Sequence, residues 1–144
     1  MDILVTENLK KIYGAGENAV HALDGVSLRV QKGEFVAVVG TSGSGKSTLL
    51  HMLGGLDRPT SGGVWVDGRE IFALRDDELT VFRRRKIGFV FQNYNLVPVL
   101  NVYENIILPV QLDGETPDEK YIGEIIEILG LGGKLNNLPN NLSG

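Results

Sequence analysis

A short glycine-rich segment, Gly40 to Thr48 (GTSGSGKST), carries the residue types needed to bind a polyphosphate. Lys46 and Ser47 follow directly after its third glycine. Successive backbone N–H groups in a tight loop can converge on phosphate oxygens, and glycines keep bulky side chains out of their way. A glycine, four residues and then Gly-Lys-Ser/Thr is the pattern of a phosphate-binding loop, or P-loop. We therefore predict that this segment binds a nucleoside triphosphate.

Several positions of this loop have an expected role. Lys46 brings a full positive charge to the outer phosphates, and the Ser47 hydroxyl is the expected Mg²⁺ ligand. A helix that begins near Lys46 adds the positive end of its dipole. The predicted nucleotide-binding residues are Gly40, Thr41, Ser42, Gly43, Ser44, Gly45, Lys46, Ser47 and Thr48. The alternative is a flexible Gly/Ser turn, which would leave the lysine unexplained.

The elements around the loop follow the order that such a site requires. Residues 3–13 and 26–30 mix apolar and polar positions, which predicts strands with one wet face. Residues 35–39 are apolar at every position, as is typical of a central strand covered on both faces. Further strands are expected at 64–66 and 87–91. Helices are expected over 46–53, 76–86, 101–108 and 117–129, the last one capped by Thr116. The sequence therefore predicts an α/β fold.

Composition excludes several classes of protein. The 144 residues suit a single domain, and 14 basic against 18 acidic residues give a net charge of −4. This acidic balance argues against nucleic acid as a partner. The absence of cysteine excludes disulfide scaffolds and thiolate metal sites. The sequence contains neither a signal peptide nor an apolar stretch of about 20 residues, which predicts a cytoplasmic location.

The P-loop and its surroundings resemble the ATP-binding subunit of ABC transporters. Tyr13 lies where that family places an aromatic residue that stacks on adenine. Gln92, after an apolar stretch, resembles the family's Q-loop glutamine, which reaches Mg²⁺ and the attacking water. Residues 24–28 and 56–62 resemble connecting segments, and 142–144 resemble the start of the signature motif. Taken without the family, Tyr13 would more often be a half-buried strand aromatic, and Gln92 would be an ordinary loop residue.

The resemblance implies a fold and a set of functional residues. The fold is an α/β P-loop NTPase core with an N-terminal antiparallel β subdomain and the start of a helical subdomain. Residues 1–92 would form the β subdomain and P-loop core, and residues 93–144 the Q-loop and a partial helical subdomain. The implied cofactors are ATP and Mg²⁺, with Lys46 and Gln92 in catalysis and Ser47 and Gln92 on the metal. Residues 95–102 are most similar to the branch that exports lipoproteins, macrolides or antimicrobial peptides.

The resemblance also implies partners and a location. Family members pair two nucleotide-binding domains on transmembrane permease subunits, at the inner face of the cell membrane. In the family, the Mg²⁺-binding aspartate, the catalytic glutamate and a switch histidine follow the signature motif. We therefore expect an N-terminal portion of the domain, truncated within that motif, whose strands at 35–39 and 87–91 lack sheet neighbours and favour self-association. Two alternatives stay open: a nucleotide-binding fragment without turnover, and a soluble ABC ATPase outside transport.

Overall fold

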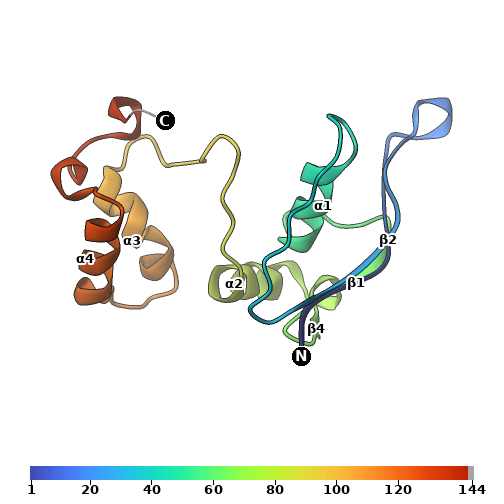
Figure 1. Cartoon of the computed structure of the whole chain (residues 1–144), viewed down its shortest axis with the longest axis horizontal. Helices are drawn as coiled ribbons and strands as arrows, with labels where there is room; N and C mark the ends of the chain where they lie inside the picture. The colour runs from blue at the N-terminus through green and yellow to red at the C-terminus, as the bar shows by residue number, and fades with distance from the viewer. Residues whose placement is uncertain (143–144) are drawn as a thin grey trace. The chain divides into compact units, whose positions relative to one another are not determined.

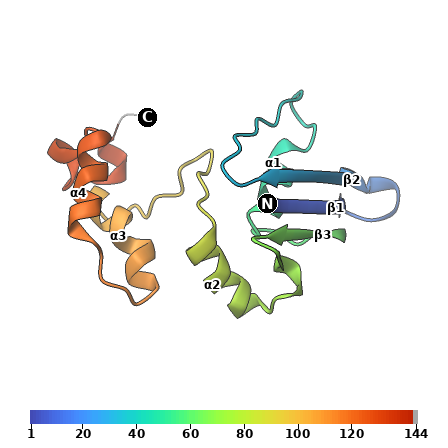
Figure 2. The same ribbon diagram turned by 60° about the horizontal axis from the view of Figure 1, so that its bottom comes forward.

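An antiparallel sheet forms the first part of the chain. In the computed structural model, which describes residues 1–142, the strands lie in the order β2-β1-β3-β4. Strand β1 (Asp2–Tyr13) pairs with β2 (Val20–Gln31) on one side and β3 (Ser61–Val66) on the other, and β4 (Arg69–Glu70) pairs with β3. Figure 2 shows β2, β1 and β3 side by side. The strands expected at 3–13, 26–30 and 64–66 are thus confirmed, as is the antiparallel β subdomain.

The chain divides into two compact units, one over residues 1–88 and the other from residue 89 onward (Figure 1). Besides the sheet, the first unit contains α1 (Lys46–Leu53), α2 (Asp76–Lys86) and two short 3-10 helices, Gly16–Asn18 and Ile71–Ala73. The two α-helices match the helices expected over 46–53 and 76–86. The predicted domain limits at residues 92 and 93 stay a prediction.

One hydrophobic core joins the sheet to α1 and α2. Strand residues such as Leu9 and Val64 have no exposed surface, and neither has Met52 of α1. Burying a side chain of this size stabilises the fold by about 1.5–3 kcal/mol. The core consists of Leu9, Leu23, Leu49, Met52, Val64, Val66, Ile71, Leu74, Leu79 and Phe82. Helix α1, which follows the P-loop, is therefore packed on the sheet whose strand β1 ends at Tyr13.

Two segments expected as strands are not strands in the structure. Residues 35–39 and 87–91 have no regular secondary structure, and Phe35, Val39 and Val90 are 94%, 86% and 89% exposed. An inner strand of a parallel sheet takes its hydrogen bonds from neighbours on both sides. Within residues 1–142, no strand pairs with either segment. The expectation that both segments lack sheet neighbours is met, while the expectation that they are strands is wrong.

The second unit is helical. Helices α3 (Val102–Leu112) and α4 (Glu119–Ile128) lie against each other through Ile107, Ile122 and Ile126. The Tyr103 hydroxyl also donates to a Glu119 carboxylate oxygen at 2.7 Å. Two 3-10 helices, Gly132–Lys134 and Pro139–Asn141, follow. The start of a helical subdomain is thereby confirmed.

The C-terminal end of α3 and the N-terminal cap of α4 differ from those predicted from the sequence. Helix α3 was expected to end at 108, yet it runs through Pro109 to Leu112. Proline removes its own N–H group, while the residues after it still donate to earlier carbonyls. The cap of α4 is Asp118 rather than Thr116, and its carboxylate accepts from the backbone N–H groups of Lys120 and Tyr121 at 3.0 and 3.1 Å. A charged acceptor at this end also suits the helix dipole.

Candidate nucleotide-binding site

The P-loop is shaped by glycines in backbone conformations that other residues avoid. Gly43 and Gly45 have φ values of 79° and 90°. Gly45 is also the N-cap of α1, and it lies so close to β2 that a Cβ atom would overlap the Ala22 carbonyl. At Gly40, a Cβ atom would lie 2.7 Å from the Ser44 hydroxyl oxygen. The loop therefore requires glycine at Gly45 on two independent grounds, backbone conformation and space.

The loop leads directly into the N-terminus of α1. The first backbone hydrogen bond of the helix runs from Leu49 N to Gly45 O, at 2.8 Å. The N–H groups of Lys46, Ser47 and Thr48 precede that bond, so they have no carbonyl partner within the helix. Three amides at the positive end of a helix dipole are a ready site for an anion. The structure thus places backbone donors where the sequence predicted a phosphate.

Lys46 lies across the loop. Its Nζ donates to the Thr41 carbonyl at 2.6 Å and to the Ser44 hydroxyl at 3.4 Å. The Ser44 backbone N–H also donates to Thr41 O at 3.2 Å, which closes the turn. Ser47 is exposed. The cation and the hydroxyl predicted for phosphate and Mg²⁺ thus lie in the first turn of α1, and their roles stay predictions.

Tyr13 lies in the same unit as the P-loop, at the end of β1. Its side chain is 42% exposed, so the ring offers surface to a ligand. The Tyr13 hydroxyl donates to Asp57 Oδ2 at 3.0 Å. Partial burial raises the pKa of Tyr13, and Asp57 raises it further by accepting this bond and by its charge. The charge of Lys11 and the Thr48 side chain oppose this rise in pKa.

Gln92 belongs to the second unit. It lies in a turn in which the Tyr94 N–H donates to Phe91 O at 3.0 Å, and its side chain is exposed. Its approach to the P-loop therefore stays a prediction. Of the three residues compared with the signature motif, Leu142 follows the last 3-10 helix, and residues 143 and 144 lie outside the described part.

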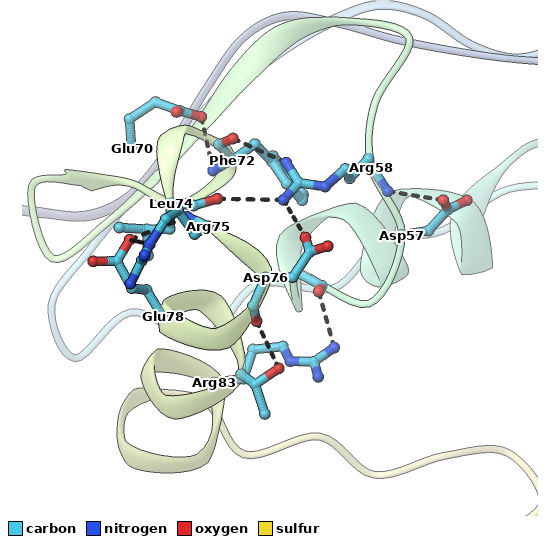
Figure 3. Close-up of polar contacts among 11 residues, drawn as sticks. Asp57, Arg58, Glu70, Phe72, Leu74, Arg75, Asp76, Glu78 and Arg83 are labelled. Atoms are coloured by element: carbon cyan, nitrogen blue, oxygen red, sulfur yellow. Dashed lines mark hydrogen bonds and ion pairs between the residues drawn. The ribbon is translucent and has the colours of Figure 1, made fainter.

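Sequence reasoning missed a polar cluster beside Tyr13. Lys11 Nζ lies 2.9 Å from the Asp57 carboxylate and 4.9 Å from the centre of the Tyr13 ring. Arg58, the residue after Asp57, is hydrogen-bonded to the Phe72 and Leu74 carbonyls and to Asp76 (Figure 3). One signal was available, because Lys11 and Tyr13 are two residues apart and so share a face of β1. Nothing in the sequence connected that face with Asp57, 44 residues after Tyr13.

None of the helices within residues 1–142 is both long enough and apolar enough to span a bilayer.

The fold matches a solved structure, the dimeric post-hydrolysis state of the ATP-binding cassette MJ0796 bound to ADP and Pi. The match has a TM-score of 0.87 and 42% sequence identity, and it covers 97% of this chain and 63% of that one. The α/β P-loop fold expected from the sequence is thus confirmed for part of such a cassette.

Relatives by sequence carry related names. An uncharacterized ABC transporter ATP-binding protein of Thermotoga maritima is 52% identical over 136 residues, which are 93% of this chain and 58% of that protein. The lipoprotein-releasing system ATP-binding protein LolD of Aquifex aeolicus is 48% identical, covering 99% of this chain and 63% of LolD. The macrolide export ATP-binding/permease protein MacB of Mannheimia succiniciproducens is 44% identical, covering 100% of this chain and 23% of MacB.

The chain thus spans less than two thirds of the length of each of these relatives. Their names agree with the branch that the sequence suggested, the exporters of lipoproteins and macrolides. A sequence profile of the ABC transporter family matches residues 23–144, which include the whole P-loop. With the fold, the loop geometry and these relatives in agreement, the chain belongs to the ABC transporter family and forms part of an ATP-binding domain.

Proposed function

We propose that the Gly40–Thr48 loop binds ATP with Mg²⁺ and that the protein uses ATP to drive export through a membrane. The observation that carries this proposal is the fit of Gly45 against Ala22. This contact fixes the loop at the N-terminus of α1, beside the side chain of Lys46. The first amides of α1 would hold phosphate oxygens, and the Lys46 charge would stabilise negative charge on the outer phosphates.

The other predicted residues complete the proposed site. The exposed Ser47 hydroxyl would bind Mg²⁺ and the Tyr13 ring would stack on adenine. The proposed role of Gln92 is that of the Q-loop glutamine, which contacts Mg²⁺ and the attacking water. Bound ATP supplies the phosphoanhydride bond whose hydrolysis drives the transport cycle. The chemistry of the donors fits a magnesium-bound polyphosphate, because hydroxyl oxygens suit Mg²⁺ and amides with a lysine suit phosphates.

The proposed partners are a second copy of the ATP-binding domain and transmembrane permease subunits. Two findings support this part of the proposal: the matched cassette is dimeric, and MacB is named an ATP-binding/permease protein. The corresponding location is the cytoplasmic face of the membrane. LolD and MacB favour lipoproteins or macrolides as the exported class.

Calorimetry of ATP binding with Mg²⁺ tests the proposal. Removing the Lys46 charge with Lys46→Ala should weaken ATP binding about 10- to 100-fold, the range for a hydrogen bond to a charged group. Lys10→Ala is the matched control, because Lys10 pairs with Asp24 in the same unit and is not part of the loop. Absence of binding by the unaltered protein, or equal affinity in Lys46→Ala, would refute the P-loop assignment.

Turnover is tested separately. Phosphate release from ATP by the full-length protein, stimulated by its membrane subunits, would support a transport ATPase. Binding of ATP without phosphate release would instead support a nucleotide-binding module.

A further inference from the structure

The Asp57 carboxylate accepts hydrogen bonds from three donors beside the proposed base site. Asp57 lies in the loop between α1 and β3, and its carboxylate accepts from the Tyr13 hydroxyl at 3.0 Å and from Lys11 Nζ at 2.9 Å. The backbone N–H of Arg58 donates to the same carboxylate at 2.8 Å. Asp57 therefore connects the end of β1 to the loop that leaves the P-loop helix.

The loop that carries Asp57 is itself anchored. The Arg58 guanidinium donates to the carbonyls of Phe72 and Leu74 at 3.0 and 3.3 Å and to Asp76 Oδ1 at 2.7 Å. Figure 3 shows Arg58 reaching these groups while its backbone N–H points to Asp57. A carboxylate on an anchored loop can hold a partner in place, whereas one on a loose loop would follow it.

Lys11 restrains the tyrosine in a different way. Its ammonium is bound between the Asp57 carboxylate and the Arg58 carbonyl, at 2.9 and 2.7 Å, and its side chain is only 13% exposed. It lies 4.9 Å from the centre of the Tyr13 ring, on the ring face, within the range of a cation–π interaction. The cation is thus fixed by two acceptors before it meets the ring.

These contacts act on different torsions of Tyr13. Rotation of the ring about χ2 leaves the hydroxyl oxygen on the rotation axis, so the bond to Asp57 sets χ1 and leaves the ring plane free. The Lys11 ammonium on the ring face restrains the plane, and hence χ2. Both torsions must be ordered before a base can stack, and ordering a side chain on binding costs affinity.

We propose that Asp57 and Lys11 are positioning residues that hold the Tyr13 ring ready for a purine base. This inference rests on the proposed function, because it needs a nucleotide whose base meets Tyr13. It goes further by assigning recognition of the base, as distinct from the phosphates, to a three-residue unit of Lys11, Tyr13 and Asp57.

The test compares two ligands that share phosphates and differ in the base. Affinities for ATP and for inorganic tripolyphosphate, each with Mg²⁺, are measured calorimetrically on the full-length protein. Asp57→Ala and Lys11→Met should weaken ATP binding about 2- to 10-fold, which corresponds to the cost of ordering one side chain. Binding of tripolyphosphate should not change. Asp57→Asn retains an acceptor for the Tyr13 hydroxyl, so it should restore part of the ATP affinity.

Two controls separate positioning from a general structural role. Asp24→Asn breaks the exposed Lys10–Asp24 pair of the same sheet, 3.0 Å long, and should leave both affinities unchanged. Asp57→Ala should add nothing to the loss caused by Tyr13→Ala, because without the Tyr13 ring Asp57 has no ring to position. The losses would instead add if Asp57 acted independently of Tyr13.

The inference is overturned if Asp57→Ala and Lys11→Met leave ATP affinity unchanged, or if they weaken ATP and tripolyphosphate equally. The second outcome would mean that they support only the P-loop. These failures differ from failure of the proposed function, in which the unaltered protein binds neither ligand. Urea unfolding of each variant identifies any loss of folded protein, and Lys11→Met and Asp57→Asn keep the test valid if Asp57→Ala folds poorly.

Discussion

Gly45 lies against Ala22 of β2 so closely that any side chain on Gly45 would overlap the Ala22 carbonyl oxygen. Gly45 also has the left-handed conformation, with φ at 90°, and caps α1. Two constraints of different origin thus meet at one residue. The sheet edge that supports the loop therefore determines where the first amides of α1 point.

Gly45→Ala should accordingly be much more harmful than Gly43→Ala. Gly43 has a similar φ of 79° but nothing within 4 Å of an added Cβ atom. Both changes place alanine in a left-handed conformation, which costs about 1–2 kcal/mol. Gly45→Ala must also displace β2, and overpacking of this kind costs about 1–3 kcal/mol more.

Urea unfolding of the two variants without nucleotide measures this difference. Equal losses of unfolding free energy in Gly45→Ala and Gly43→Ala would show that the loop can move away from Ala22.

Asn105 organises the segment that follows the Q-loop. Its side chain accepts from Val97 N at 2.8 Å and donates to the carbonyls of Val97, Leu100 and Asn101 at 3.2, 2.9 and 3.0 Å. Asn105→Ala should destabilise the second unit by about 1–3 kcal/mol, because these partly buried backbone groups lose their partner. Hydrogen exchange of the Val97 amide should become at least about fivefold faster.

Two further variants sharpen this measurement. Asn105→Asp keeps an acceptor for Val97 but loses the donor to three carbonyls, so it should destabilise the segment at least as much as alanine does. Gln111→Ala, an exposed change in the same helix, should alter neither quantity. Unchanged exchange at Val97 in Asn105→Ala would show that the segment is held by other contacts.

Local sequence signals were sufficient where the structure depends on neighbours in the chain. The glycines, Lys46 and Ser47 identified the loop, and α1 runs over the predicted residues. Asp67 and Gly68, a residue pair typical of tight turns, join β3 to β4, and both have positive φ values, 52° and 75°. Turns and helix ends depend on a few adjacent residues, so their residue types suffice.

Long-range contacts could not be predicted in the same way. The apolar run at 35–39 fits an inner strand, yet strand formation depends on partners that no local pattern supplies. Similarly, Asp57 lies 44 residues from Tyr13, and the hydrogen bond between them is visible only in the three-dimensional structure. The cap predicted for α4, Thr116, and the cap found in the structure, Asp118, are both residue types that suit a helix start, so residue type alone could not separate them.

The apolar run at 35–39 predicts self-association of the 144-residue chain studied alone. Phe35 and Val39 are 94% and 86% exposed, and contact between copies would bury this surface at a gain of about 25 cal/mol per Å². The double variant Phe35→Glu, Val39→Glu should therefore shift the chain toward monomer in sedimentation velocity. Val20→Glu, at a valine that is 60% exposed in β2, is the matched control.

Two results would contradict self-association through Phe35 and Val39. A monomeric unaltered chain with a single sharp unfolding transition would contradict it, as would an equal shift in the Val20→Glu control.

The pKa of Tyr13 gives a direct readout of its contact with Asp57. The pKa is raised first by partial burial and then by the hydrogen bond to Asp57 and its negative charge. Because the folded-state pKa exceeds the unfolded value of about 10, the neutral phenol stabilises the fold below pH 10. This stabilisation is lost as pH rises through the folded-state pKa. Asp57→Asn removes the charge, so it should lower the Tyr13 pKa and move this loss to a lower pH.

NMR titration of ¹³C-labelled tyrosine, with the Tyr13 signal assigned through Tyr13→Phe, measures this shift. Tyr103 is the internal control, since its pKa is raised by the hydrogen bond to Glu119 in the second unit. Its titration should be the same in the unaltered protein and in Asp57→Asn. A Tyr13 pKa that stays constant or rises in Asp57→Asn would show that the negative charge of Asp57 does not raise the pKa of Tyr13.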